Sequence, residues 1–281
     1  MRIKVLEITV ERALSNSGLP DIDYALNPYI GCSHGCLYCY AKMYTNLREV
    51  VDNWGSTVAV KKNLIEVLMK EIKKVKKGTI GIGTITDPYQ PIEALYRLTR
   101  KAVEILVRHG FKVSIQTKSS QILRDLDLFL RYRNLIDIGI TITSVEDTSP
   151  MNRFEPYSSP PSARINALKK LSTSGLKTWI FYGPVIPGYN DDFDKIQYVL
   201  EIARETRSIV YLDKLRIKRF MWIDHQWHDI VITSSRYQWH EFYAKVSKLC
   251  RDIGVECRRG FEEDNEYRDS YKKLEDYIIK K

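Results

Sequence analysis

Long hydrophobic runs are absent from this chain of 281 residues, and cysteine is scarce. No stretch approaches the roughly 20 apolar residues that a helix needs to span a bilayer. Residues 1–7 (MRIKVLE) also lack the apolar segment of a signal peptide. We therefore expect a cytoplasmic protein without a membrane partner. Five cysteines are an odd and sparse number, so a disulfide framework of the kind that holds small secreted proteins together is not expected.

Three of these cysteines, Cys32, Cys36 and Cys39, lie close together in residues 31–40 (GCSHGCLYCY). A structural zinc site needs four Cys or His ligands, and iron–sulfur clusters are normally held by four thiolates. Three thiolates therefore leave one metal position open to a ligand that is not protein. The CxxxCxxC spacing packs the sulfurs into one loop, which favours a single cubane cluster with one iron that no side chain holds.

Other metal and thiol sites are less well supported by the sequence. His34 as a fourth zinc ligand would lie inside the first cysteine interval, which would strain a tetrahedral chelate. Cys250 and Cys257 are interpreted most simply as buried or incidental thiols, with a hydrogen-atom donor as the weaker alternative. His225 and His228 have no clear third ligand, so no second metal is assigned to them.

The charge balance favours a polyanionic partner. The formal net charge is +9 and the pI is about 9.1, and basic surfaces concentrate phosphate-bearing ligands. Lysine runs such as residues 73–77 are also typical of solvated helix faces. Residues 218–229 (KRFMWIDHQWHD) interleave aromatic and basic side chains, which suits either a base-stacking loop or an apolar lid.

Alternating strand and helix patterns predict an α/β fold with parallel strands and right-handed crossovers. The hydrophobic content of 44% is enough for a sizeable core, and no linker divides the chain. Periodicity alone does not separate a barrel from a doubly wound sheet, but the motifs follow strand ends, where α/β barrels build their sites. The predicted strands are 24–30, 79–84, 111–117, 137–143, 176–182 and 209–215, and the predicted helices are 61–76, 91–108, 121–131, 162–174 and 192–204, with a sixth helix after an insertion.

Four segments carry a resemblance to a known family: residues 27–41 (NPYIGCSHGCLYCYA), 86–93 (TDPYQPIE), 115–119 (IQTKS) and 184–190 (PVIPGYN). With them the chain resembles the radical S-adenosylmethionine (radical SAM) superfamily, and within it the spore photoproduct lyase-related group, often described as DNA repair photolyase-like. The superfamily signature CxxxCxΦC has an aromatic residue before its last cysteine, and Tyr38 matches it.

The resemblance implies an architecture, namely a partial (β/α)6 TIM-like barrel with a C-terminal extension. We expect an N-terminal extension over residues 1–20 and the radical SAM partial barrel over residues 21–260. For residues 261–281 we expect a helical tail packed on the barrel, because Tyr271, Leu274 and Ile278 form one apolar stripe.

The resemblance also implies the chemistry. Cys32, Cys36 and Cys39 would hold a 4Fe-4S cluster whose fourth iron binds S-adenosyl-L-methionine. Reductive cleavage would give a 5′-deoxyadenosyl radical that abstracts hydrogen from a substrate, with electrons from an external donor such as a ferredoxin or flavodoxin. The substrate is left open, with DNA or RNA as candidates. The alternative is a metal-stabilised nucleic-acid-binding module without catalysis.

Matching positions in this sequence give the expected contacts with S-adenosylmethionine. Gly83, Thr84 and Asp87 would hold its amino group, since a carbonyl or carboxylate suits an ammonium. Asp87 is equally well explained as a turn and helix-start residue. Lys118 would contact the cofactor's carboxylate, although a lone lysine at a strand end is usually solvated. The remaining contacts would be Thr143 and Ser144 to the ribose hydroxyls, and Ile186 with the backbone of 185–188 to adenine.

One departure from the family pattern affects function. Spore photoproduct lyases carry a further cysteine near the second strand that supplies a hydrogen atom during repair. This chain has no cysteine between Cys39 and Cys250, so thymine-dimer repair with that donor is not expected. One of the 18 tyrosines could serve instead, but the sequence does not select it.

Overall fold

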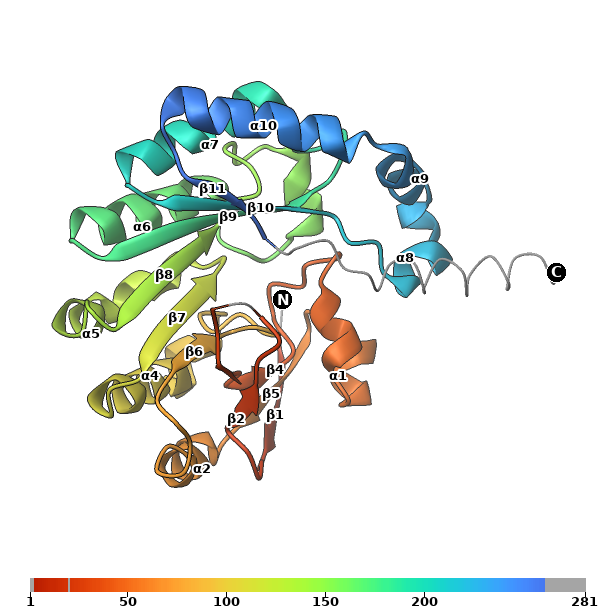
Figure 1. Cartoon of the computed structure of the whole chain (residues 1–281). Coiled ribbons are helices and arrows are strands. Elements are labelled where there is room, and N and C mark those ends of the chain that lie inside the picture. Colours follow the sequence, from red (N-terminus) through yellow and green to blue (C-terminus); the bar gives the residue numbers. More distant parts are fainter. Residues whose placement is uncertain (1–2, 20, 261–281) are drawn as a thin grey trace.

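An eight-stranded sheet is the centre of the computed structural model, which describes residues 3–19 and 21–260 (Figure 1). The strand order is β11-β10-β9-β8-β7-β6-β3-β2, and every neighbouring pair is parallel except β2 with β3. The strands are β2 Leu14–Asn16, β3 Tyr24–Leu26, β6 Thr79–Ile82, β7 Lys112–Thr117, β8 Ile136–Thr141, β9 Lys177–Val185, β10 Ile209–Lys214 and β11 Cys257–Arg259.

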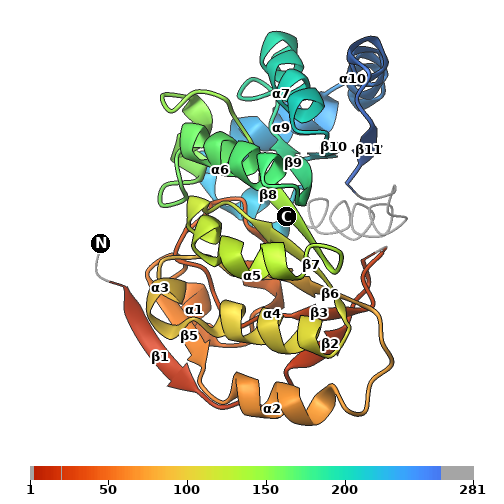
Figure 2. The ribbon, with the colours of Figure 1, turned by 90° about the vertical axis from the view of Figure 1, so that its left-hand side faces the viewer.

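Six strands of this sheet, β3 and β6 to β10, are the parallel strands of six strand–helix units. Helices cover its outer face, and Figure 2 shows α4, α5 and α6 in a row over the face turned to the viewer. The outer strands β2 and β11 do not pair with each other, so the barrel is open. The predicted partial (β/α)6 barrel is confirmed. The covering helices are α2 Leu64–Glu71, α4 Leu98–Arg108, α5 Leu126–Arg131, α6 Pro161–Thr173, α7 Phe193–Glu205 and α10 Trp239–Ile253, with the short α3 Glu93–Tyr96 before α4.

The core lies between this sheet and its helices. Strand side chains such as Ile138 and Ile180 are fully buried, as are Val103 and Leu106 on the inward stripe of α4. Burying an aliphatic side chain of this size stabilises the fold by about 1.5–3 kcal/mol. The apolar spacing that predicts each helix is therefore also what attaches that helix to the sheet.

The first predicted strand, residues 24–30, is wrong as a single element. Only β3 joins the main sheet. After Pro28 the chain crosses to a second, three-stranded sheet of order β1-β5-β4, formed by β1 Lys4–Ile8, β5 Thr57–Lys61 and β4 Tyr29–Ile30. Proline has no amide hydrogen for a ladder bond, so the pairing changes there. The N-terminal residues thus contribute strands to both sheets.

The insertion between β10 and α10 forms α8 Arg219–Ile223, a 3-10 helix η4 His225–Trp227, and α9 His228–Arg236. Met221 and Trp227 are buried in a second apolar cluster that also contains Phe154 and Ile186. Of the two roles predicted for residues 218–229, the segment therefore packs mainly as an apolar lid. Trp222 and Ile223 remain exposed on it.

Cys250 and Cys257 form a disulfide, with their Cα atoms 6.2 Å apart. The expectation of two separate thiols was therefore wrong. Helix α10 ends at Ile253, the left-handed backbone of Gly254 reverses the chain, and β11 then pairs parallel with β10. This reversal places Cys257 opposite Cys250.

The predicted tail over 261–281 lies outside the described residues. Within 3–19 and 21–260 no helix is long and apolar enough to cross a membrane.

Candidate functional site

The cysteine loop lies between β4 and the 3-10 helix η1 Tyr40–Tyr44. Its three cysteines are free, and Cys32 and Cys36 are buried while Cys39 is partly exposed. The loop needs glycine at its start, because Gly31 has a φ of +83° and a Cβ there would lie 2.5 Å from Val50 Cγ1. The carbonyl of Cys32 and that of Cys36 each accept a hydrogen bond from the backbone three residues on, at 3.2 Å. Two successive turns therefore bring the three thiols into one compact loop.

The segment 86–93, which follows β6, holds the start of this loop in place. Gln90 is fully buried and donates to the Gly31 carbonyl at 3.2 Å, while its side-chain oxygen accepts the Ser33 N–H at 2.8 Å. The Thr86 hydroxyl donates to the same Gly31 carbonyl at 2.5 Å. Cys32 is thus fixed by hydrogen bonds to the residues on both of its sides.

Asp87 connects the cysteine loop to the end of β7. Its carboxylate accepts the Thr117 hydroxyl at 2.6 Å and the Lys118 N–H at 2.8 Å, and its Oδ2 lies 3.3 Å from His34 Nδ1. Burial alone would raise the pKa of this carboxyl, but His34 and the two hydrogen bonds outweigh burial and hold the pKa below its usual value. Both oxygens thus bind protein groups, and the contact with the cofactor's amino group stays a prediction.

The donor set, three free thiols in one loop, fits an iron–sulfur cluster, which takes each thiolate on a different iron. Among the described residues no group of three or more His, Cys, Asp or Glu side chains is placed to hold a single metal ion. Burial raises the pKa of all three thiols, and metal coordination is what deprotonates a thiol in such a place. Cys32, Cys36 and Cys39 would therefore hold the cluster.

Glu155, in the segment after β8, is a buried carboxylate that binds several side chains around the cysteine loop. Its side chain is 1% exposed, and it accepts hydrogen bonds from the Tyr38 hydroxyl, from the Thr143 hydroxyl at 2.9 Å and from the Arg164 guanidinium. Lys118 Nζ lies 3.5 Å from its Oε1. Burial opposes the charge, but Arg164 and Lys118 overcome it and lower the pKa of Glu155 to about 2. Three predicted residues, Tyr38, Lys118 and Thr143, therefore meet on one carboxylate.

Gly83 and Thr84 follow the end of β6, and their contact with the cofactor's amino group stays a prediction. The Thr84 carbonyl accepts the hydroxyl of Tyr40, the residue after the last cysteine, and the Thr84 hydroxyl accepts from the Asn27 amide at 3.0 Å. Gly83 has a φ of +86°, and a Cβ there would lie 2.4 Å from Pro88 Cδ. The turn therefore requires glycine for its backbone, whatever it binds.

Ser144 and Ile186, the predicted contacts to ribose and adenine, are both buried. The Ser144 hydroxyl donates to the Glu146 carbonyl at 3.1 Å. Ile186 is fully buried in the lid cluster, and its N–H donates to Asn190 Oδ1 at 2.7 Å. Their predicted contacts with ribose and adenine stay predictions.

Sequence reasoning missed Glu155, Arg164 and the role of Gln90. Gln90 was within reach, because it belongs to one of the four segments that carry the family resemblance. Glu155 had no such signal, since it lies in the irregular segment 146–160 after β8. That segment lies against the cysteine loop through hydrogen bonds from the Leu37 N–H to the Phe154 carbonyl at 2.9 Å and from the Tyr157 N–H to the His34 carbonyl at 3.3 Å.

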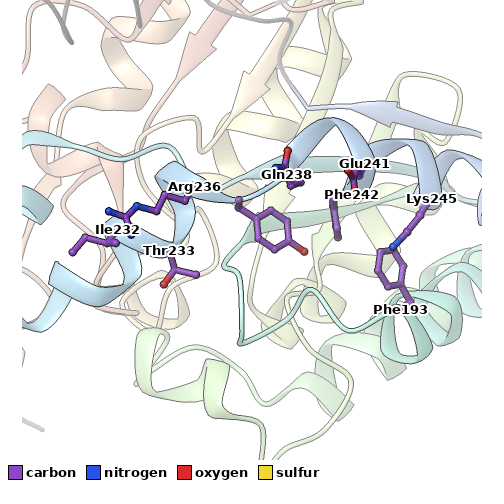
Figure 3. Close-up of a pocket in the computed structure, with 9 residues that line it drawn as sticks. Phe193, Ile232, Thr233, Arg236, Gln238, Glu241, Phe242 and Lys245 are labelled. Atoms are coloured by element: carbon purple, nitrogen blue, oxygen red, sulfur yellow. The ribbon is translucent and has the colours of Figure 1, made fainter.

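Hollows that open to solvent in the described part of the chain include one of about 510 Å³ and a smaller one. The larger of these two is lined by residues of α9, α10 and the start of α7, among them Phe193 and Phe242 (Figure 3), and by Tyr237 between α9 and α10. No predicted site residue lines it, so it is not the site of the cysteine chemistry. The smaller, of about 370 Å³, lies beside the end of η1.

An open parallel barrel with a three-cysteine loop against its strand ends defines a class of protein, the radical SAM class. The chain belongs to the radical SAM superfamily, which residues 26–197 match. It is 32% identical over 217 residues to an uncharacterized protein of Methanocaldococcus jannaschii, covering 77% of this chain and 80% of that one. It is also 34% identical over 172 residues to an uncharacterized protein of Acidianus two-tailed virus, covering 58% of this chain and 56% of that one.

The fold is similar to that of spore photoproduct lyase. A mutant of that enzyme, with bound AdoMet and dinucleoside spore photoproduct, superposes with a TM-score of 0.66 over 92% of this chain and 81% of that one, at 15% sequence identity. At this identity the likeness concerns the fold. It confirms the predicted relationship to the spore photoproduct lyase group at the level of architecture.

Proposed function

We propose that the chain is a radical SAM enzyme that holds a 4Fe-4S cluster on Cys32, Cys36 and Cys39 and acts on a nucleic acid. The observation that carries this proposal is the set of three free thiols in a loop that Thr86 and Gln90 fix on both sides of Cys32. When bound, the cluster and S-adenosylmethionine would supply a 5′-deoxyadenosyl radical for hydrogen abstraction.

The protein's own part would be orientation and exclusion of water. Thr86 and Gln90 fix the loop at Cys32, and Asp87 fixes it through His34. Lys118 lies over the Tyr38 ring, with Nζ 5.6 Å from the centroid, and it is 15% exposed. Its ammonium would bind the cofactor's carboxylate. The carbonyl of Thr84, which accepts the Tyr40 hydroxyl, would hold the cofactor's ammonium.

A nucleic-acid substrate is supported by the net charge of +9 and by the fold that the chain shares with an enzyme solved with a dinucleoside photoproduct. The hydrogen donor would differ from the cysteine of that family, since Cys250 and Cys257 are joined in a disulfide. A ferredoxin or flavodoxin would deliver the electron.

The test is anaerobic reconstitution with iron and sulfide, then dithionite and S-adenosylmethionine, with chromatographic measurement of 5′-deoxyadenosine. The expected result is a 4Fe-4S absorption spectrum and product, both lost in Cys36→Ala. Cys250→Ala with Cys257→Ala is the control, because it removes two cysteines that lie outside the cysteine loop and leaves the three free thiols in place. Zinc uptake without a cluster would instead support a metal-stabilised binding module.

A further inference from the structure

The smaller hollow, which we call the Lys61 pocket, contains a cation with no counter-charge. It is lined by nine residues, of which Lys61 is the one that carries a charge: Ile8, Tyr29, Ile30, Tyr44, Thr45, Asn46, Leu47, Lys61 and Ile85. Within the described part of the chain, no hydrogen bond or ion pair of the Lys61 ammonium is found. Lys61 ends β5, and its neighbour Lys62 is exposed.

Burial lowers the pKa of Lys61, and burial is the only cause found. No nearby carboxylate therefore offsets the desolvation of this ammonium. An uncompensated cation on the wall of a pocket costs stability, and a titratable group perturbed in this way in a cleft is a candidate for a binding site.

Two exposed aromatic rings connect the pocket with the end of the cysteine loop. Helix η1 begins at Tyr40, directly after Cys39, and ends at Tyr44 on the pocket wall. The two rings pack edge to face with centroids 5.9 Å apart, and they are 41% and 63% exposed. Ile85 reaches the pocket from the turn that also carries Thr84. A substrate bound beside the cysteine loop would therefore extend over the rings of Tyr40 and Tyr44 toward Lys61.

We infer that the Lys61 pocket binds a phosphate-bearing nucleotide of a single-stranded nucleic-acid substrate, next to the unit that reacts. Lys61 would contact the phosphate, and the exposed face of Tyr44 would stack on a base. The pocket volume of about 370 Å³ lies in the range of small-ligand sites. This inference rests on the proposed function, because it assigns a binding site for part of the nucleic-acid substrate proposed there.

The test compares Lys61→Met with the control Lys62→Met in the full chain. Binding of a short fluorescein-labelled oligothymidylate is measured by anisotropy across a salt series, and thermal unfolding is measured in parallel. Lys61→Met should weaken binding about tenfold and reduce the slope of log K against log salt by about 1. It should also raise the melting temperature, since it removes a desolvated charge. Lys62→Met should leave the affinity, the salt slope and the melting temperature unchanged.

The combination of weaker binding and higher stability separates a ligand site from a structural role. Equal losses in the Lys61 and Lys62 variants would overturn the inference, because they would indicate diffuse attraction. It would also fail if Lys61→Met weakened binding of a fluorescent acidic peptide and left oligothymidylate binding unchanged. The assay needs neither cluster nor cofactor, so its failure is distinct from failure to form 5′-deoxyadenosine.

Discussion

Lys118 Nζ lies 3.5 Å from Glu155 Oε1, and this pair joins the end of β7 to the segment after β8. The same carboxylate also binds Arg164, so two cations share one buried anion. Lys118 can therefore leave Glu155 for another carboxylate without leaving Glu155 unpaired. The arrangement suits a lysine that is held in position before a ligand arrives.

Replacing Glu155 with Gln is expected to destabilise the fold by about 3–5 kcal/mol, because a buried ion pair that loses one partner leaves an uncompensated charge. Urea unfolding measures the change. Glu146→Gln is the control, since Glu146 forms an exposed pair with Lys195 at 2.9 Å and its side chain is 51% exposed. That variant should lose at most about 1 kcal/mol. Equal effects of the two substitutions would contradict the assigned role of Glu155.

Stability is also expected to depend on pH through Glu155. Its pKa is about 2 in the folded protein, against about 4.3 in an unfolded chain. A lowered folded pKa stabilises the fold above the unfolded value, and this stabilisation, of about 3 kcal/mol, is lost as pH falls from about 4 through 2. The free energy of unfolding of the wild type minus that of Glu155→Gln should therefore shrink over this range. A difference that stays constant from pH 6 to the acid limit would rule out the mechanism.

The strand–helix order and the cysteine loop could be predicted from sequence because both are local patterns. Apolar periodicity locates five of the six parallel strands and part of the first, and the cysteine spacing predicts the ligand set. The partners of Glu155 were not predictable in this way, since Tyr38, Thr143 and Arg164 meet only in three dimensions. The disulfide between Cys250 and Cys257 was not predicted for a similar reason. Seven residues of spacing do not reveal that Gly254 reverses the chain.

Gln90 is expected to matter for holding the cluster rather than for folding the barrel. Gln90→Leu keeps the volume and removes the hydrogen bonds to Gly31 and Ser33, so the loop should bind iron less tightly. We expect a lower iron and sulfide content after gel filtration and faster bleaching of the cluster by a chelator. Gln197→Leu on the exposed face of α7 is the matched control. Equal iron retention by both variants would show that the loop does not depend on Gln90.

Lys118 offers a test of the contact between the barrel and the cofactor. If its ammonium binds the carboxylate of S-adenosylmethionine, Lys118→Met should weaken cofactor binding about tenfold or more, the value of one charge-assisted hydrogen bond. Equilibrium dialysis of the cofactor on the reconstituted protein measures this. Cluster content should be unchanged, because the Asp87 carboxylate accepts the backbone N–H of residue 118 whatever the side chain. Lys118→Arg should restore part of the affinity, since it keeps the charge. If Lys118→Met bound the cofactor as tightly as the wild type, the lysine would serve only to pair with Glu155.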